Sequence, residues 1–401
     1  LACTDFRDPH HKPLGQLSVT YCTKNIKVLQ IFILTIINGY DILILMETSI
    51  LYCIFNRPDV VEQTFVPIKE AKPKKLYIAS DGARENREDE DKIVEQTRKY
   101  VLDNIDWNCE VHTLFQDKNL GCDTAVPKAI EWFFKYEEMG IILEDDILAS
   151  QEFFEFCTIL LEKYKNDQRV RSIGGFCISK GVDYEYDYAF TPRPLTWGWA
   201  AWRRSWDGFD ITISDWKKLK HTQWLKRIFN THIYKRLEWS EIFDIYFGDC
   251  AWDYAYSFAN MKLVEKGCYS LSPANKNLIT NIGYSGVHFN SDNCKCLGWK
   301  IDYIDVKNLK HPKFVGADEK YLKMCYDLEA LYEAQKYKDM SFLKLFKDNF
   351  IFLFRMPLTF LKYLLARDED TRNRRKKRIL WLKYNFKKTN FYYWINRKNR
   401  T

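Results

Sequence analysis

The sequence has few of the residues that build linkers: its 401 residues include only 16 Gly and 11 Pro. Low-complexity segments are therefore not expected. Its 12 Cys stand singly, apart from Cys294 and Cys296, and lack the paired CxxC spacing of zinc sites. We expect reduced cysteines packed as small apolar residues, which favours a protein that is cytosolic or faces the cytosol. A mean hydropathy of −0.41 excludes a polytopic membrane protein.

Long apolar runs are also scarce. Four residues interrupt the best candidate, residues 26–46: Gln30, Asn38, Gly39 and Asp41. An acid near the centre of a membrane-spanning helix costs about 2.5–3.5 kcal/mol. Two interpretations stay open. Either the segment is a weak membrane anchor, or residues 1–45 are an upstream extension and the folded protein begins at Met46.

Positive charge is concentrated at one end of the chain. Residues 371–401 hold twelve Lys or Arg and no acid, so the rest is mildly acidic although the net charge is +7. A nucleic-acid-binding protein usually spreads its basic residues over the folded surface, and a nucleic-acid partner is therefore not favoured.

The C-terminal region, residues 301–401, is predicted to be helical and basic. A helix is expected over 318–336, and residues 342–365 mix Phe and Leu with lysines as interfacial helices do. Each basic residue near an anionic lipid surface contributes about 1 kcal/mol. We expect peripheral contact with the cytosolic face of a membrane. A helical subdomain that closes over the catalytic core and a disordered tail are the alternatives.

Short apolar segments alternate with amphipathic ones after Met46. The pattern predicts strands over 49–55, 75–79, 109–115 and 140–143, and helices over 58–71, 86–102, 123–138 and 151–165. Alternation with short connections indicates an α/β domain with a mainly parallel sheet and helices on both faces.

Polar residues follow the predicted strands. Arg57, Asp81, Asn119 and the cluster Glu144–Asp146 all lie at strand ends, where ligands of such sheets bind. Three consecutive acids repel one another unless a positive charge lies between them. Mg²⁺ or Mn²⁺ favours carboxylate oxygens and also retains phosphate and water ligands, so a metal beside Arg57 would suit a nucleoside diphosphate. The alternative is a solvated acidic turn that caps the next helix.

The segment GIILEDDI resembles the DxD-type motif of GT-A glycosyltransferases. Residues 47–295 resemble the bacterial nucleotide-diphospho-sugar transferases and, more distantly, the eukaryotic N-acetylglucosaminyltransferases that act on α-mannosides. The matching segments, in order, are FNRPDVV, LYIASDG, KNLGC, GIILEDDI, TWGWAAWRRSW, AWDYAY and NIGYSGVHF. The resemblance implies a GT-A catalytic domain over 46–300. It also implies inverting, metal-dependent transfer from a nucleoside-diphosphate sugar, with UDP favoured, to a glycan or lipid-linked acceptor.

The same resemblance implies roles for individual residues. Asp81 would contact the base of the nucleotide, and Arg57 would lie near the donor phosphates. Glu144 and Asp145 would contact the donor sugar or the ribose. The expected donor-binding residues are Arg57, Asp81, Asn119, Gly121, Glu144, Asp145, Trp197 and Gly198. The expected ligands of Mn²⁺ or Mg²⁺ are Asp146 and His288. The segment that contains His288 is one residue shorter than in the family, which leaves direct ligation or a position beside the diphosphate open.

An inverting transfer needs one carboxylate to accept the proton of the attacking hydroxyl. By resemblance Asp253, in the segment AWDYAY, is that general base. The distant relatives have two adjacent acids where this chain has Asp253 and Tyr254, so Asp249 is the alternative.

Residues 195–206, LTWGWAAWRRSW, contain four tryptophans and two arginines. They are expected to form an aromatic wall for the acceptor sugar, part of the core, or both. Gly198 would allow the backbone to approach the donor closely. The four-residue spacing of Trp202 and Trp206 predicts that they pack along a helix.

Three other functions compete with the glycosyltransferase. A sugar nucleotidyltransferase uses a similar sheet but normally carries a Gly-rich phosphate loop after its first strand, whereas residues 55–58 read FNRP. A non-catalytic module would bind the nucleotide sugar without turnover. A nucleic-acid-binding protein would act through the basic tail, with salt-sensitive affinity.

Overall fold

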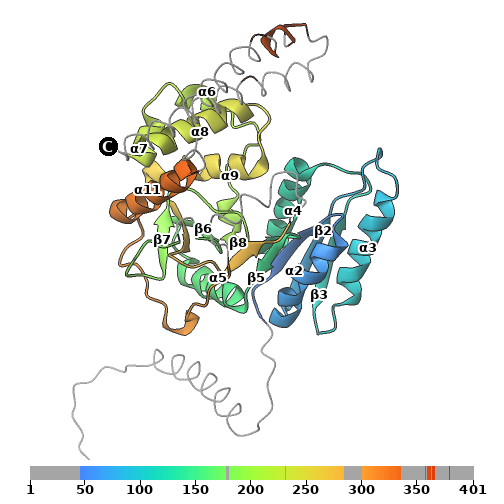
Figure 1. Ribbon diagram of the computed structural model, residues 1–401. Coiled ribbons are helices and arrows are strands. Elements are labelled where there is room, and N and C mark those ends of the chain that lie inside the picture. Colours follow the sequence, from blue (N-terminus) through green and yellow to red (C-terminus); the bar gives the residue numbers. More distant parts are fainter. Residues whose placement is uncertain are drawn as a thin grey trace, which may run out of the picture. The chain divides into compact units, whose positions relative to one another are not determined.

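The computed structural model describes residues 46–177, 180–230, 232–283 and 300–335, together with a few isolated positions between 357 and 379 (Figure 1). The interpretations of residues 1–45, of His288 and of the basic tail fall outside the described residues. None of the helices in the described part of the chain has the length and apolar character needed to span a bilayer.

An eight-stranded mixed sheet forms the centre of the protein, in the order β3-β2-β1-β4-β8-β6-β9-β7. Its strands are β1 Ile50–Ile54, β2 Lys75–Ser80, β3 Glu110–Phe115, β4 Met139–Glu144, β6 Val170–Gly174, β7 Tyr188–Thr191, β8 Trp199–Trp202 and β9 Tyr269–Pro273. Strands β1 to β4 are mutually parallel, as are β6 and β9, whereas β8 is antiparallel to both neighbours and β7 to β9. The predicted α/β class with a mainly parallel sheet is confirmed.

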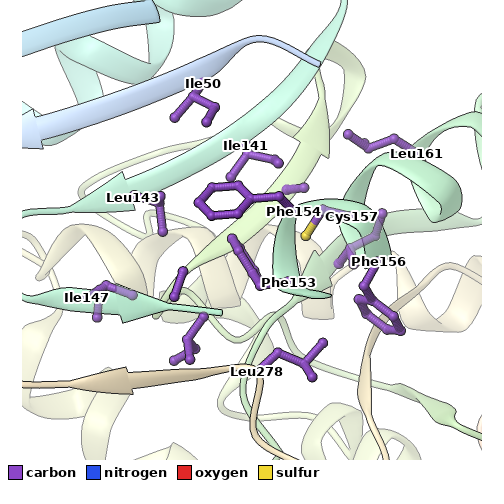
Figure 2. Packing of buried hydrophobic residues seen from close by; sticks show 14 of the residues in the cluster. Ile50, Ile141, Leu143, Ile147, Phe153, Phe154, Phe156, Cys157, Leu161 and Leu278 are labelled. Carbon is purple, nitrogen blue, oxygen red and sulfur yellow. The ribbon is translucent and has the colours of Figure 1, made fainter. Parts of the chain in front are cut away.

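Helices cover both faces of this sheet. One face packs against α2 Pro58–Ala71, α3 Glu90–Asp103 and α5 Gln151–Tyr164, and the other against α4 Cys122–Tyr136 and α9 Trp252–Met261. A strand buried on both sides must be apolar at every position, which explains the continuous runs in the sequence. In β1, Ile50, Tyr52 and Ile54 face α2 and α5, while Leu51 and Cys53 face α4. Figure 2 shows the first of these layers, with Phe153 and Phe154 of α5 beside β4.

The tryptophan-rich segment is a strand, so the expected helical packing of Trp202 and Trp206 is wrong. Residues 199–202 form β8, which pairs with β4 and β6, and a single 3₁₀ turn follows from Arg203 to Ser205. All four residues of β8 are buried: Trp199 faces α4 and α9, and Trp202 faces α5. Because β8 pairs with a strand on each side, its backbone must be extended. The four-residue spacing of Trp202 and Trp206 fits a helix, but strand pairing decides the local structure.

A helical lobe contains a second core. It comprises α6 Trp216–Leu219, α7 Trp224–Phe229, α8 Ile233–Tyr246 and α11 Glu319–Gln335, which lie together in Figure 1. The helix predicted over 318–336 is thus confirmed as α11. The ammonium group of Lys235, on α8, is 2.8 Å from Glu238 and 2.6 Å from Glu329, and its side chain is 2% exposed. This buried pairing joins α8 to α11 within the lobe.

Candidate nucleotide-binding site and general base

The loops that follow β1 to β4 meet at one edge because these four strands are parallel neighbours. Arg57 precedes α2 as its N-cap residue, and Pro58 is the first residue of that helix. The structure brings Arg57 together with Asp145 and Asp146, and Asp81 together with Asn119.

The three acids at the carboxyl end of β4, Glu144–Asp146, have different surroundings. The Asp145 side chain is 4% exposed; its Oδ1 accepts a hydrogen bond from Arg57, and its Oδ2 accepts one from the backbone N–H of Phe55 at 3.0 Å. Burial raises the pKa of Asp145 to about 6, although the charge of Arg57 opposes this shift. The Asp146 side chain is 20% exposed, and its Oδ2 accepts from Arg57 at 3.3 Å. Asp145 therefore holds the guanidinium in place, whereas Asp146 reaches solvent.

Glu144 connects this cluster to the predicted general base. Burial raises the pKa of Glu144, and the charges of Asp146, Asp145 and Asp253 raise it further. Asp253 lies in the first turn of α9, whose start is fixed by a 3.2 Å hydrogen bond from the N–H of Trp252 to Asp123. Asp253 is thus an electrostatic neighbour of the acids after β4.

The alternative base, Asp249, is exposed and precedes α9 in the loop that leaves α8. It is not among the main charges that shift the pKa of Glu144. The charge that acts on Glu144 is thus that of Asp253, while the choice between Asp253 and Asp249 as general base stays a prediction.

Asp81 organises the loop between β3 and α4. Its carboxylate accepts four hydrogen bonds, from the N–H groups of Gly82 (2.9 Å), Leu120 (2.8 Å) and Gly121 (3.0 Å) and from the side chain of Asn119 (3.0 Å). These use the lone-pair sites that a carboxylate offers. Contacts of Asp81, Asn119 and Gly121 with a nucleotide base stay predictions, and the observed role of Asp81 is to position the loop.

Glu90, the first residue of α3, is a second organising carboxylate. Its side chain accepts hydrogen bonds from Asn56 at 2.8 Å, from the N–H of Arg84 at 2.8 Å and from the guanidinium of Arg84. Glu90 is 4% exposed and joins the loop after β1 to the loop after β2. No motif marks Glu90 in the sequence, and the helix predicted over 86–102 begins at Glu90 rather than at Asn86. The only sequence signal is an acid at a helix start with an arginine six residues earlier.

We expect Glu90→Gln to lower the free energy of unfolding by about 2 kcal/mol at pH 7. Hydrogen bonds from Arg84 lower the pKa of Glu90 to about 2, below its value in the unfolded chain. This stabilisation is complete above the unfolded pKa and is lost as pH falls from about 4.5 to about 2. Urea unfolding across that range measures it, with Glu95→Gln on the exposed face of α3 as control. A wild-type-to-variant difference that is independent of pH would contradict the prediction.

Trp197 and Gly198 precede β8, and Gly198 lies against Ile147, the residue that follows the acidic cluster. Gly198 has φ +57°, and a Cβ there would lie 3.1 Å from the side chains of Ile147 and Ile279. The side chains of Ile147 and Ile279 thus occupy the space beside Gly198. Contact between Gly198 and a donor stays a prediction. Trp197 is half-buried and its ring centroid is 5.5 Å from that of Phe176. By sequence, residues 195–206 are expected to form an aromatic wall, part of the core, or both. The residues of β8 are part of the core.

Gly283 is the second site residue that the sequence analysis missed. It follows β10 (Ile279–Asn281), which pairs with β5 (Ile147–Ala149) directly after the acids. The N–H of Ile282 donates to the backbone oxygen of Asp146 at 2.8 Å. A Cβ at Gly283 would lie 2.7 Å from Cβ of Asp146 and 2.8 Å from Nη1 of Arg57. The chain therefore passes directly over the Arg57–Asp146 pair.

Among the described residues, a divalent cation could be held only if the substrate supplied some of its ligands. They contain no group of three or more His, Cys, Asp or Glu side chains that could hold a metal ion. Asp146 nevertheless offers a partly exposed carboxylate in an acidic surrounding beside Arg57. Mg²⁺ and Mn²⁺ are commonly held by one or two carboxylates together with substrate phosphates and water, and Asp146 fits that pattern.

Comparisons with known proteins give fold likeness alone. No protein-family model and no curated protein matches the chain. It is similar to the solved structure of HddC from Yersinia pseudotuberculosis at 10% identity and TM-score 0.23, over 35% of this chain and 66% of that chain, just under two thirds. The inositol-1-phosphate CTP transferase from T. maritima gives 10% identity and TM-score 0.31, over 64% of this chain and 99% of that chain. The structure of apo UDP-glucose pyrophosphorylase gives 10% identity and a TM-score of 0.26, over 58% of this chain and 93% of that chain. These values indicate a general likeness of α/β architecture and nothing about substrate or reaction.

Proposed function

We propose that the protein is a GT-A glycosyltransferase that transfers a sugar, with inversion, from a nucleoside-diphosphate sugar to a glycan or lipid-linked glycan. The observation that carries this proposal is the Arg57–Asp146 pair at the strand ends, with Asp253 near enough for its charge to act on Glu144. A half-buried carboxylate whose charge acts on Glu144, together with Arg57 and a metal-compatible acid, would supply what inverting transfer requires: a proton acceptor and a site for the leaving diphosphate.

Each of these residues has a distinct task in the proposed reaction. Arg57, held by Asp145, binds the diphosphate through its planar fork. Asp146 would hold Mn²⁺ or Mg²⁺, which when bound supplies positive charge to the diphosphate oxygens. The oxygen of the acceptor hydroxyl forms a bond to the anomeric carbon, and Asp253 accepts the proton of that hydroxyl. The bond from that carbon to the phosphate oxygen breaks, and its electron pair leaves with the nucleoside diphosphate.

A sugar nucleotidyltransferase, which uses a similar sheet, is the second candidate; two of the solved structures of similar architecture are named as a CTP transferase and a pyrophosphorylase. That reaction joins a nucleoside triphosphate to a sugar phosphate, whose oxygen is already a nucleophile and needs no general base. It would leave the position of Asp253 without a function. The loop after β1, residues 55–58, also lacks the glycines that cradle a triphosphate.

The product released from a nucleotide distinguishes these two reactions. The full chain is incubated with UDP-, GDP-, TDP- and CMP-sugars, and separately with nucleoside triphosphates plus sugar 1-phosphates, with Mn²⁺ or with EDTA. We expect slow, metal-dependent release of nucleoside diphosphate from one donor, and its loss in Asp146→Asn but not in the exposed control Asp103→Asn. Release of pyrophosphate would establish the second candidate. Binding without turnover, with or without acceptor glycans, would indicate the non-catalytic module.

Cellular location follows from the proposal rather than from the described residues. A lipid-linked acceptor would be met at the cytosolic face of a membrane, to which the basic tail would bind. Truncation at residue 340 should then release the protein from membrane fractions, while unchanged partitioning would exclude the tail as the anchor.

A further inference from the structure

A second cluster of side chains lies next to Asp253, within the helical lobe. Tyr254 on α9 is in ring contact with Tyr246 (centroids 5.1 Å apart) and with Trp239 of α8 (6.0 Å). The guanidinium of Arg193, in the loop after β7, lies over Trp239 at 5.4 Å from the ring centroid. We call Arg193, Trp239, Tyr246 and Tyr254 the arginine–aromatic cluster.

Arg193 is a half-buried cation. It forms no ion pair with any residue that the structure describes, and its Nε is buried without a hydrogen-bond partner. By contrast, Arg57 and Arg84 are paired with carboxylates in the donor half of the site. Removing a guanidinium from water without an anion is unfavourable, and the face of Trp239 compensates only part of it. An arginine kept in this state is suited to binding an anion from outside.

Two more buried donors lie in the same lobe. Nε1 of Trp239 and the hydroxyl of Tyr326 are buried and have no partner among the described residues. Burial raises the pKa of Tyr326 and of Tyr254, while the charge of Arg193 acts in the opposite direction on both. Arg193 is therefore an electrostatic neighbour of Tyr254, the residue that follows Asp253.

Asp253 is adjacent in sequence to residues of two different cores. In the first turn of α9, Trp252 packs into the core that α4 covers, and Tyr254 packs against the core of the helical lobe. The charge of Asp253, between them in sequence, raises the pKa of Tyr246 and Tyr254 and also that of Glu144. A molecule on the arginine–aromatic cluster would thus lie next to Asp253.

We propose that the arginine–aromatic cluster binds an anionic sugar as the acceptor. The sugar ring lies against Tyr246 and Tyr254, its carboxylate or phosphate pairs with Arg193, and one of its hydroxyls reaches Asp253. Aromatic faces and a planar cationic fork are the groups that recognise a charged sugar. This inference rests on the proposed function for the transfer step, but the binding itself requires no donor.

Binding of simple sugars to the full chain tests the inference without turnover. The probes are methyl β-D-glucuronide, glucose 6-phosphate and the neutral methyl β-D-glucoside, measured by titration calorimetry. We expect at least one anionic probe to bind about 10-fold or more tightly than the neutral one, and the stronger of the two distinguishes a carboxylate from a phosphate. Arg193→Gln should remove this preference, Arg193→Lys should keep part of it, and the exposed control Arg227→Gln should leave it unchanged.

The outcomes separate this inference from the proposed function. Equal binding of all three probes, or a preference that persists in Arg193→Gln, would overturn the inference even where a nucleotide sugar binds normally. A preference that Arg193→Gln removes, in a protein that binds no donor, would support the inference and count against the glycosyltransferase. If Arg193→Gln does not fold, the wild type decides: added salt must weaken binding of the anionic probe more than that of the neutral one.

Discussion

Replacing Asp253 with Asn is expected to lower kcat by about 10³-fold, within the range found for loss of general-base catalysis. The amide keeps the size of the side chain but cannot accept the proton of the acceptor hydroxyl. The donor should bind with unchanged affinity, because Arg57 and Asp146 are held by contacts that do not involve Asp253.

The control for this experiment is Asp249→Asn, four residues earlier in the exposed loop. It should retain most of the wild-type rate. The measurements are single-turnover transfer to a saturating acceptor and calorimetric donor binding for both variants. A large loss in Asp249→Asn with little change in Asp253→Asn would reverse the assignment. Losses of donor affinity as large as the loss of rate would make Asp253 a structural residue.

The order of strands and helices was predictable because each central strand is buried on both faces. Such burial leaves continuous apolar runs like Ile50–Ile54, and the helices between them show one apolar side. The bounds of α2 and α4 agree with the predicted ranges to within two residues. Placement of the polar residues at one edge then followed from parallel strand order alone.

The tasks of individual carboxylates were not predictable, because they depend on which donors fill their oxygens. Asp81 and Asp145 look like ligands in the sequence, yet loop N–H groups and Arg57 occupy their oxygens. Glu90 carries no motif, and its role depends on Arg84 and Asn56 from two different loops. Sequence spacing records none of these contacts.

The helical lobe was equally hidden. Its core brings together segments between residues 182 and 326 that show no common pattern. The expectation for residues 195–206 is an aromatic wall, part of the core, or both, and β8 in that segment is buried in the sheet. The aromatic residues that lie beside Asp253 come instead from α8 and α9, and only the folded chain brings Arg193 to them.

Gly283→Ala is expected to weaken binding of the nucleotide-sugar donor about 30- to 100-fold, with the fold retained. The backbone of Gly283 is not in the left-handed region, so alanine is conformationally acceptable there. The added methyl would lie 2.7 Å from Cβ of Asp146 and 2.8 Å from Nη1 of Arg57. Arg57 can rotate away, but Cβ of Asp146 is fixed to its backbone, so the carboxylate and the guanidinium must both shift.

The matched control is Gly316→Ala, whose added methyl would contact only the exposed side chain of Phe314. Donor affinity by calorimetry and thermal midpoints are compared for both variants, with a metal titration for each. The Gly283 variant should need more Mn²⁺ for half-maximal donor binding, because Asp146 is displaced, whereas the Gly316 variant should match wild type. Wild-type donor and metal affinities in Gly283→Ala would show that the Arg57–Asp146 pair does not hold the diphosphate, and the donor site would have to be sought elsewhere along the strand ends.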